Sequence, residues 1–167
     1  MLPFVETESI LGLEIHLFRP VLMFFLLICS LVGWCEPYKD AAGFQYEPPA
    51  NWVRGESLWH NGKNSQVLVT DSVKVAGLSL GPWVEAVVKQ GPEKKWQDIK
   101  VLDTSLGDLP AKCITLTDVS GSKPMFMKMY LVVRENTGSV LTFVSENGDS
   151  AEFEESVQGV FQSFRWL

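Results

Sequence analysis

Four segments in the second half of the chain alternate apolar and polar residues, and this restricts the fold more than any other feature. A period of two is typical of half-buried β-strands. The connections between the segments are short and rich in Gly, Asn, Asp and Ser, which favours tight turns between antiparallel neighbours. The four segments are residues 99–104, 111–119, 124–134 and 139–146. We therefore expect an antiparallel sheet.

One helix is expected before these segments, where Gly81-Pro82 places a proline in a position that the first helical turn tolerates. Four apolar residues then fall on one helical face, and Gly91-Pro92 ends the segment. They are Trp83, Val84, Val87 and Val88. Residues 92–98 are ambiguous and could add one more helical turn.

A second helix is expected at the end of the sequence. Its apolar stripe consists of Phe153, Val157, Val160, Phe161 and Phe164. Asp149, with Glu152 three residues later, indicates a capping box at its start.

Short strands are also expected at residues 43–46, which prolines follow, and at residues 66–70, which are rich in β-branched residues. Because each helix has one apolar face, both should pack on the sheet. The predicted class is α+β, with an antiparallel sheet of about six strands flanked by helices.

Residues 1–35 differ from the rest and are interpreted as an N-terminal leader. Residues 20–34 carry no charge, and Arg19 precedes them. This run is short for a membrane span and typical of a signal peptide, with cleavage possible after Cys35. Glu6, Glu8 and Glu14 are unusual there, so translation starting nearer Met23 is an alternative.

Two other fates of the leader stay open. Residues 17–34 could form an uncleaved, tilted anchor, which would be the chain's contact with a membrane. Cys35 could instead be lipidated, although Trp34 stands where the peptidase needs a small side chain.

Residues 36–167 are expected to form a single domain, since no linker or repeat divides them. The whole chain has 14 Lys and Arg against 20 Asp and Glu, a net charge of −6. An acidic chain without a basic stripe is a poor candidate for binding nucleic acid. Cys113 lies in an apolar segment, which indicates a buried side chain rather than a nucleophile.

The candidate binding surface consists of Trp59, His60 and Trp96. Both tryptophans lie in less regular segments, and tryptophan is enriched at contact surfaces. His60 is the only histidine of residues 36–167. A hydrolase built around it is one hypothesis, but the sequence shows neither a nucleophile nor an orienting carboxylate beside it. The neighbouring Asn61-Gly62 favours a hairpin turn instead.

No catalytic residue, cofactor or metal site is predicted. One histidine and one cysteine are too few for zinc, and no loop has the ligand spacing of a calcium or phosphate site. The run Met125-x-Met127-x-Met129 could suggest copper. Because these residues share one face of a strand with Leu131 and Val133, they are better explained as a core that meets the C-terminal helix.

The beginning, middle and end of residues 38–167 resemble the PsbP-like domains, which have the Mog1/PsbP fold. The motifs are Tyr38-x-Asp40-x-x-Gly43-Phe44-x-Tyr46-x-x-Pro49-x-x-Trp52, Gly107-x-Leu109-Pro110-Ala111, and Val140-Leu141-Thr142-Phe143 followed by Ser163-Phe164-Arg165. The resemblance implies an antiparallel sheet of the α/β/α sandwich type. Its members include extrinsic proteins on the lumen side of photosystem II, a nuclear-transport cofactor and bacterial exported proteins of the DcrB-like group.

The resemblance implies no enzyme activity, since these members share no catalytic set. We expect a non-enzymatic exported protein, periplasmic or otherwise extracytoplasmic, that contacts a protein of the envelope or of a membrane complex. The alternative is a carrier of a small ligand or lipid, with a cleft between sheet and helices.

Overall fold

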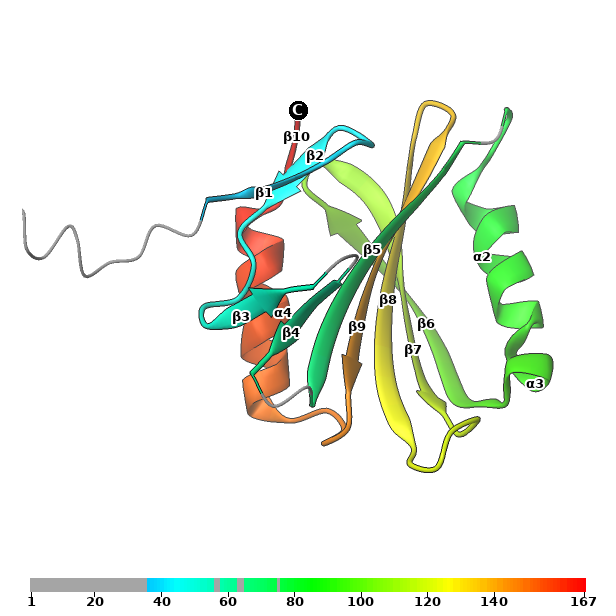
Figure 1. Ribbon diagram of the computed structural model, residues 1–167. Helices are drawn as coiled ribbons and strands as arrows, with labels where there is room; N and C mark the ends of the chain where they lie inside the picture. The colour runs from blue at the N-terminus through cyan, green and yellow to red at the C-terminus, as the bar shows by residue number, and fades with distance from the viewer. Residues whose placement is uncertain (1–35, 56–57, 63–64, 75) are drawn as a thin grey trace, which may run out of the picture. The chain divides into compact units, whose positions relative to one another are not determined.

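The described part of the chain is built on one large antiparallel sheet with helices on both faces (Figure 1). The computed structural model describes residues 36–55, 58–62, 65–74 and 76–167. Within these residues, no helix has the length and apolar character needed to cross a bilayer. The expectations for residues 1–35 fall outside the described residues.

The elements follow one another in this order along the chain. The strands are β1 (Tyr38–Asp40), β2 (Phe44–Tyr46), β3 (Trp52–Arg54), β4 (Leu58–Asn61), β5 (Gln66–Lys74), β6 (Trp96–Leu106), β7 (Leu109–Asp118), β8 (Met125–Arg134), β9 (Thr137–Ser145) and β10 (Arg165–Trp166). The helices are α2 (Leu80–Lys89), α3 (Gly91–Lys94) and α4 (Ala151–Ser163). The ambiguous segment after α2 therefore divides into the short helix α3 and the start of β6.

In the part of the chain that the structure describes, the main sheet has seven strands in the order β3-β4-β5-β9-β8-β7-β6. Every neighbouring pair is antiparallel. The four alternating segments form β6 to β9, which confirms the α+β prediction of an antiparallel sheet flanked by helices. The main sheet differs from the expected six strands in two ways: the hairpin of β3 and β4 lies beside β5, and the strand expected at residues 43–46 forms β2 of a separate sheet. Strands β3 and β4 are too short to show a period in the sequence.

A small sheet of three strands joins distant parts of the described residues, in the order β1-β2-β10. Its centre is β2, which pairs with β1 on one side and with β10 on the other. The backbone N–H of Leu167 donates to the carbonyl of Gly43 at 2.8 Å. The Phe44 ring packs against Phe164 and Trp166, with centroids 5.3 and 5.8 Å apart. Backbone pairing and aromatic contact thus link β2 with the end of the sequence.

Helix α4 and the small sheet cover one face of the main sheet and form a core that we call the α4-side core. It contains fully buried aromatic side chains from β2, β9 and α4, among them Phe44, Phe143 and Phe153. Cys113 also lies in this core, 7% exposed, so its predicted burial is confirmed. The stripe predicted for α4 is confirmed as well, because Phe153, Val157 and Val160 are its buried residues.

The predicted capping box of α4 is wrong by one residue. Ser150, not Asp149, precedes the first helical turn in an extended conformation. Its side-chain oxygen accepts a hydrogen bond from the backbone N–H of Phe153 at 3.2 Å. Asp149 instead forms an ion pair with Lys128 of β8, at 3.2 Å. The prediction failed because a serine and an aspartate stand side by side, and either can cap a helix.

Helices α2 and α3 lie on the opposite face, where they form a second core that we call the α2-side core (Figure 1). Its buried residues are Val84, Ile114, Leu116 and Leu131, with Trp83, Met127 and Met129 packed against them. The methionine face of β8 therefore meets α2, and its predicted contact with the C-terminal helix is wrong. The intervening residues Phe126 and Tyr130 face α4 instead. Alternation predicted which residues share a face, but not which helix covers that face.

Glycine at position 138 allows α2 to approach β9 closely. A Cβ atom there would lie 2.7 Å from Leu78 Cδ2 and 2.7 Å from two ring carbons of Trp83. We therefore expect Gly138→Ala to lower the free energy of unfolding by about 1–3 kcal/mol, since overpacking forces neighbours out of their preferred rotamers.

Gly159→Ala is the matched control for this substitution. Gly159 lies in the exposed part of α4, and a Cβ there meets nothing within 4 Å. Alanine at this helix position should raise stability by about 0.5–1 kcal/mol. Urea unfolding of both variants measures the two effects. An unchanged or increased stability of Gly138→Ala would contradict the close packing of α2 on β9.

The buried phenol of Tyr46 predicts loss of stability in alkali. Its hydroxyl lies near the polar groups of Thr70 and Trp59 without a hydrogen-bond partner among the described residues. Burial raises the pKa of Tyr46 above its ordinary value of 10.0. The unfolded chain therefore loses this proton first, and the free energy of unfolding falls as the pH rises past 10.

We expect Tyr46→Phe to leave stability at pH 7 equal or higher, because no buried hydrogen bond is lost. The same variant should lose less stability than the wild type between pH 9 and 11. Thermal unfolding over this range tests the expectation. An equal alkaline loss in both proteins would show that Tyr46 does not contribute.

Candidate functional site

The structure does not bring the three residues of the predicted binding surface together. Trp59 of β4 packs against the α4-side core, and its ring lies 6.3 Å from the ring of Tyr38. Trp96, the first residue of β6, packs against the α2-side core. The two tryptophans therefore belong to opposite faces of the main sheet, and the sheet separates them.

His60 lies in β4, next to Trp59 and opposite Val53 and Val67 of the neighbouring strands. Its Nδ1 atom is 2.9 Å from the backbone carbonyl of Asn61. No hydroxyl or thiol among the described side chains is hydrogen-bonded to its ring. The Asn61 side chain accepts from the backbone N–H of Ser65 and so stabilises the start of β5. These contacts show His60 as part of a β-hairpin. They provide no catalytic partner for its ring among the described side chains.

The environment of Trp96 is that of a strand end. Trp96 pairs with Asp118 of β7. Hydrogen bonds from the side chain and backbone of Ser120, with a smaller contribution from Trp96, lower the pKa of Asp118. This carboxylate is used by the turn that follows β7 and stays ionised at neutral pH.

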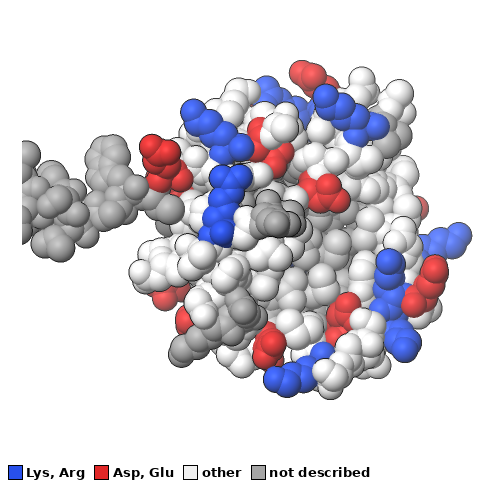
Figure 2. Space-filling view, in the orientation of Figure 1, with Lys and Arg blue, Asp and Glu red and all other residues white. Residues whose placement is uncertain are grey.

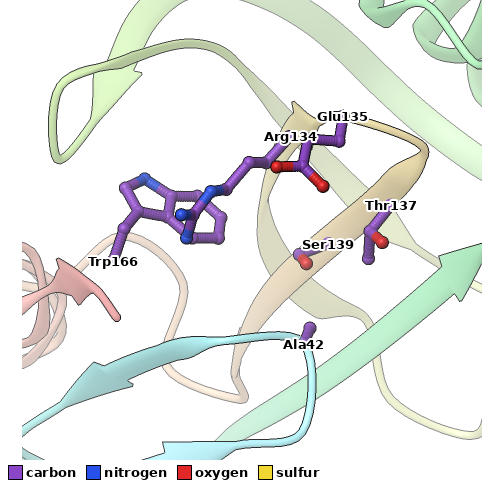
Figure 3. Close-up of a pocket in the computed structure, with 6 residues that line it drawn as sticks. All are labelled: Ala42, Arg134, Glu135, Thr137, Ser139 and Trp166. Carbon is purple, nitrogen blue, oxygen red and sulfur yellow. The ribbon is translucent and has the colours of Figure 1, made fainter.

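A small polar pocket lies elsewhere, where the turn between β8 and β9 approaches β10 (Figure 3). The cavity has a volume of about 140 Å³. It is lined by Ala42, Arg134, Glu135, Thr137, Ser139 and Trp166. Ligand pockets typically enclose about 300–1,000 Å³, so this one suits a molecule of few atoms or a single side chain.

Arg134 is held in this pocket by three contacts. Its Nη1 donates to the carbonyl of Leu167 at 3.1 Å and, at 3.5 Å, to the carbonyl of Gly43. Its guanidinium lies over the Trp166 ring, 5.4 Å from the centroid. The indole Nε1 of Trp166 donates in turn to the carbonyl of Leu106 at 3.2 Å. The Arg134 guanidinium is therefore held against the Trp166 ring, and the hydrogen bond to Leu106 holds that ring in place.

The turn beside Arg134 carries backbone strain. Arg134 pairs with Thr137 across the hairpin, so the connection has two residues. Glu135 takes the first of these positions with φ of 57°, in the left-handed region that favours glycine. Such strain persists only where the surroundings impose it, and it often accompanies functional sites.

Two hydroxyl side chains complete the lining. Ser139 is 1% exposed, and its Oγ lies 3.2 Å from the Oγ of Ser72 on β5. Thr137 is half-buried at the start of β9. The pocket thus offers one cation, one carboxylate and two hydroxyl groups.

The sequence interpretation missed Arg134 and Trp166. No motif marks them, because they lie 32 positions apart and meet only through the pairing of β10 with β2. The motif containing Phe164-Arg165 ends one residue before the tryptophan. The sequence predicted a hairpin between residues 134 and 139, and the structure shortens its connection to Glu135 and Asn136. That signal did not single out Arg134.

Metal chemistry finds no support in the described residues. No group of three or more His, Cys, Asp and Glu side chains lies there in a position to hold an ion. Met127 and Met129 are packed under α2 as core residues. Burial raises the pKa of the Cys113 thiol, so this sulfur stays protonated at neutral pH.

One long strand at the edge of the main sheet is exposed. No described strand lies beyond β6. Val101 and Leu102 on this strand are 41% and 56% exposed. In the face shown in Figure 2, basic and acidic side chains are interspersed, and neither sign forms one large patch. On that face, charge does not single out a binding surface.

Comparisons by sequence found no relatives: no family model matches the chain, and no curated protein is similar enough to match. Comparisons of structure did. Cyanobacterial PsbP (CyanoP) from Synechocystis sp. PCC 6803 is 11% identical, with a TM-score of 0.56 over 81% of this chain and 95% of that one. LpqN of Mycobacterium tuberculosis, which is involved in cell envelope biogenesis, is 12% identical, with a TM-score of 0.57 over 77% and 87%.

A protein of Bacteroides thetaiotaomicron is also similar, at 14% identity and a TM-score of 0.53. The match covers 78% of this chain and 48% of the Bacteroides protein, so this chain spans about half its length. Identities this low establish the fold alone. The resemblance seen in the sequence motifs is confirmed at that level: residues 38–167 have the Mog1/PsbP fold.

Proposed function

We propose that this chain is an exported, non-enzymatic accessory protein that binds a partner protein of the cell envelope or of a membrane complex. The fold it shares with CyanoP and with LpqN supports this proposal. The absence of a partner for His60 among the described hydroxyls and thiols argues against the hydrolase hypothesis. The single observation that carries a binding role is the free edge of β6.

Strand β6 is a ready template for an added strand. Its inner side pairs with β7 along nearly all its length. No described strand pairs with its outer side, so the outward backbone N–H and C=O groups are available to another chain. An extended segment of a partner could therefore pair with this edge, as in other strand-addition complexes.

The usable part of this edge is short. Between Gln97 and Lys100 the register shifts, and Asp98 has a φ of 53°, so the first third of β6 is irregular. Irregularities of this kind discourage strand pairing. Regular pairing with β7 resumes at Lys100 and includes Val101 and Leu102, which expose apolar surface on the two faces of the sheet. We place the partner's segment beside residues 101–105.

The carrier alternative receives less support from the structure. Apolar side chains of sheet and helices pack against one another in both cores. The pocket beside Arg134 is polar and, at about 140 Å³, too small for an acyl chain.

Photo-crosslinking tests the proposal in the native host. A photoreactive residue replaces Leu102 in the full chain, and the matched control carries it at Gln158, an exposed position on α4. We expect one partner to be crosslinked from position 102 and not from 158. A bait mass beginning near Glu36 would support export with cleavage. Recovery of the bait alone, or of the same protein from both positions, would contradict the proposed edge.

A charge on the edge gives a second test. Leu102→Lys should weaken partner binding about tenfold, since burying one leucine contributes about 1.5 kcal/mol or more. Gln158→Lys adds the same charge away from the edge and should not change the affinity. Titration of the purified partner against the three proteins measures this. Equal affinities would show that the partner binds elsewhere.

A further inference from the structure

We propose that the pocket beside Arg134 binds a small zwitterion that carries both a carboxylate and an ammonium group, of which a free α-amino acid is the simplest example. This site is separate from the β6 edge, and its test does not depend on the proposed partner. The inference rests on the pocket's charges, its hydroxyl groups and its size.

The guanidinium of Arg134 has unused donors. It carries five N–H groups, and in the described residues only Nη1 has hydrogen-bond acceptors. None of the described Asp and Glu side chains forms an ion pair with it, since the side-chain ion pairs found in the described residues involve only lysines. A planar cation stacked on Trp166 and facing a cavity matches a carboxylate, which it can bind through two parallel hydrogen bonds.

The neighbouring carboxylate excludes a simple anion site. Glu135 lines the same pocket and is exposed at the strained position of the turn. It would repel an anion of single charge and attract an ammonium group. The charges of Arg134 and Glu135 sum to zero, so a ligand with one charge of each sign complements both.

The remaining lining provides hydrogen-bonding groups for the same ligand. Ser139 Oγ has one described partner, the Oγ of Ser72, and a hydroxyl can both donate and accept. Figure 3 shows the hydroxyl side chains of Ser139 and Thr137 near the Glu135 carboxylate, with Arg134 reaching over the Trp166 ring. A cavity of about 140 Å³ accepts glycine, alanine or serine more readily than an aromatic amino acid.

Calorimetric titration of the full chain tests this proposal, with alanine, acetate and methylammonium as separate probes. We expect alanine to bind at least tenfold more tightly than either single-charge probe, and phenylalanine to bind more weakly than alanine. Arg134→Gln and Glu135→Gln should each weaken alanine binding at least tenfold, since each removes one charge-assisted contact.

Arg54→Gln is the matched control. Arg54 also lies over aromatic rings, 5.1 Å from the Tyr38 centroid and 5.9 Å from that of Trp59, but it does not line this pocket. Its loss should leave alanine binding unchanged. Binding of acetate as tight as that of alanine would overturn the zwitterion assignment. Absence of alanine binding at millimolar concentration, or binding unaffected by Arg134→Gln and Glu135→Gln, would overturn the site.

Glu135→Gly separates a binding role from a structural one. Glycine relieves the backbone strain at φ of 57°, so the midpoint of thermal unfolding should rise by about 2–4 °C. The same variant should lose alanine binding because the carboxylate is gone. A variant that is more stable and binds alanine as well as the wild type would contradict the role of Glu135.

Discussion

The pairing of β8 with β9 in the middle of the main sheet is the constraint on which the rest of the described fold depends. Because side chains alternate along both strands, one face of the pair receives Tyr130, Leu141 and Phe143 and the other receives Met129 and Leu131. Each face then takes its own helix. A shift of one residue in the register would exchange the two faces and leave both helices without complementary cores.

The two cores differ in how they are closed. The α2-side core is formed by segments close in sequence, from α2 to β9, and the glycine at position 138 allows the helix to come near. The α4-side core combines the first strands with the last helix, and the aromatic contacts of Phe44 secure that connection. The same connection brings Trp166 under Arg134 and creates the small polar pocket. The pocket thus forms because segments distant in the sequence pack together, and no local motif produces it.

Local sequence features predicted most of the elements, since periods of two and 3.6 are set by burial on one face. The four alternating segments and both long helices are present near their expected positions. What could not be predicted is which element covers which face: Met127 and Met129 met α2 instead of α4. Alternation defines the sides of a strand but carries no information on the partner of each side. Trp59 and Trp96 were grouped as exposed aromatics, and the sheet separates them for the same reason.

The joining of β2 to β10 also has a kinetic consequence. Residues 44–46 cannot complete their sheet, and the α4-side core cannot close, until residues 153–166 have been synthesised. Contacts between such distant segments slow folding, because the chain loses loop entropy before it gains the contact. During synthesis the earlier strands therefore keep apolar surface exposed, and such surface makes a folding chain prone to aggregate in the absence of chaperones. The domain therefore completes its fold only once residues 153–166 are available to it.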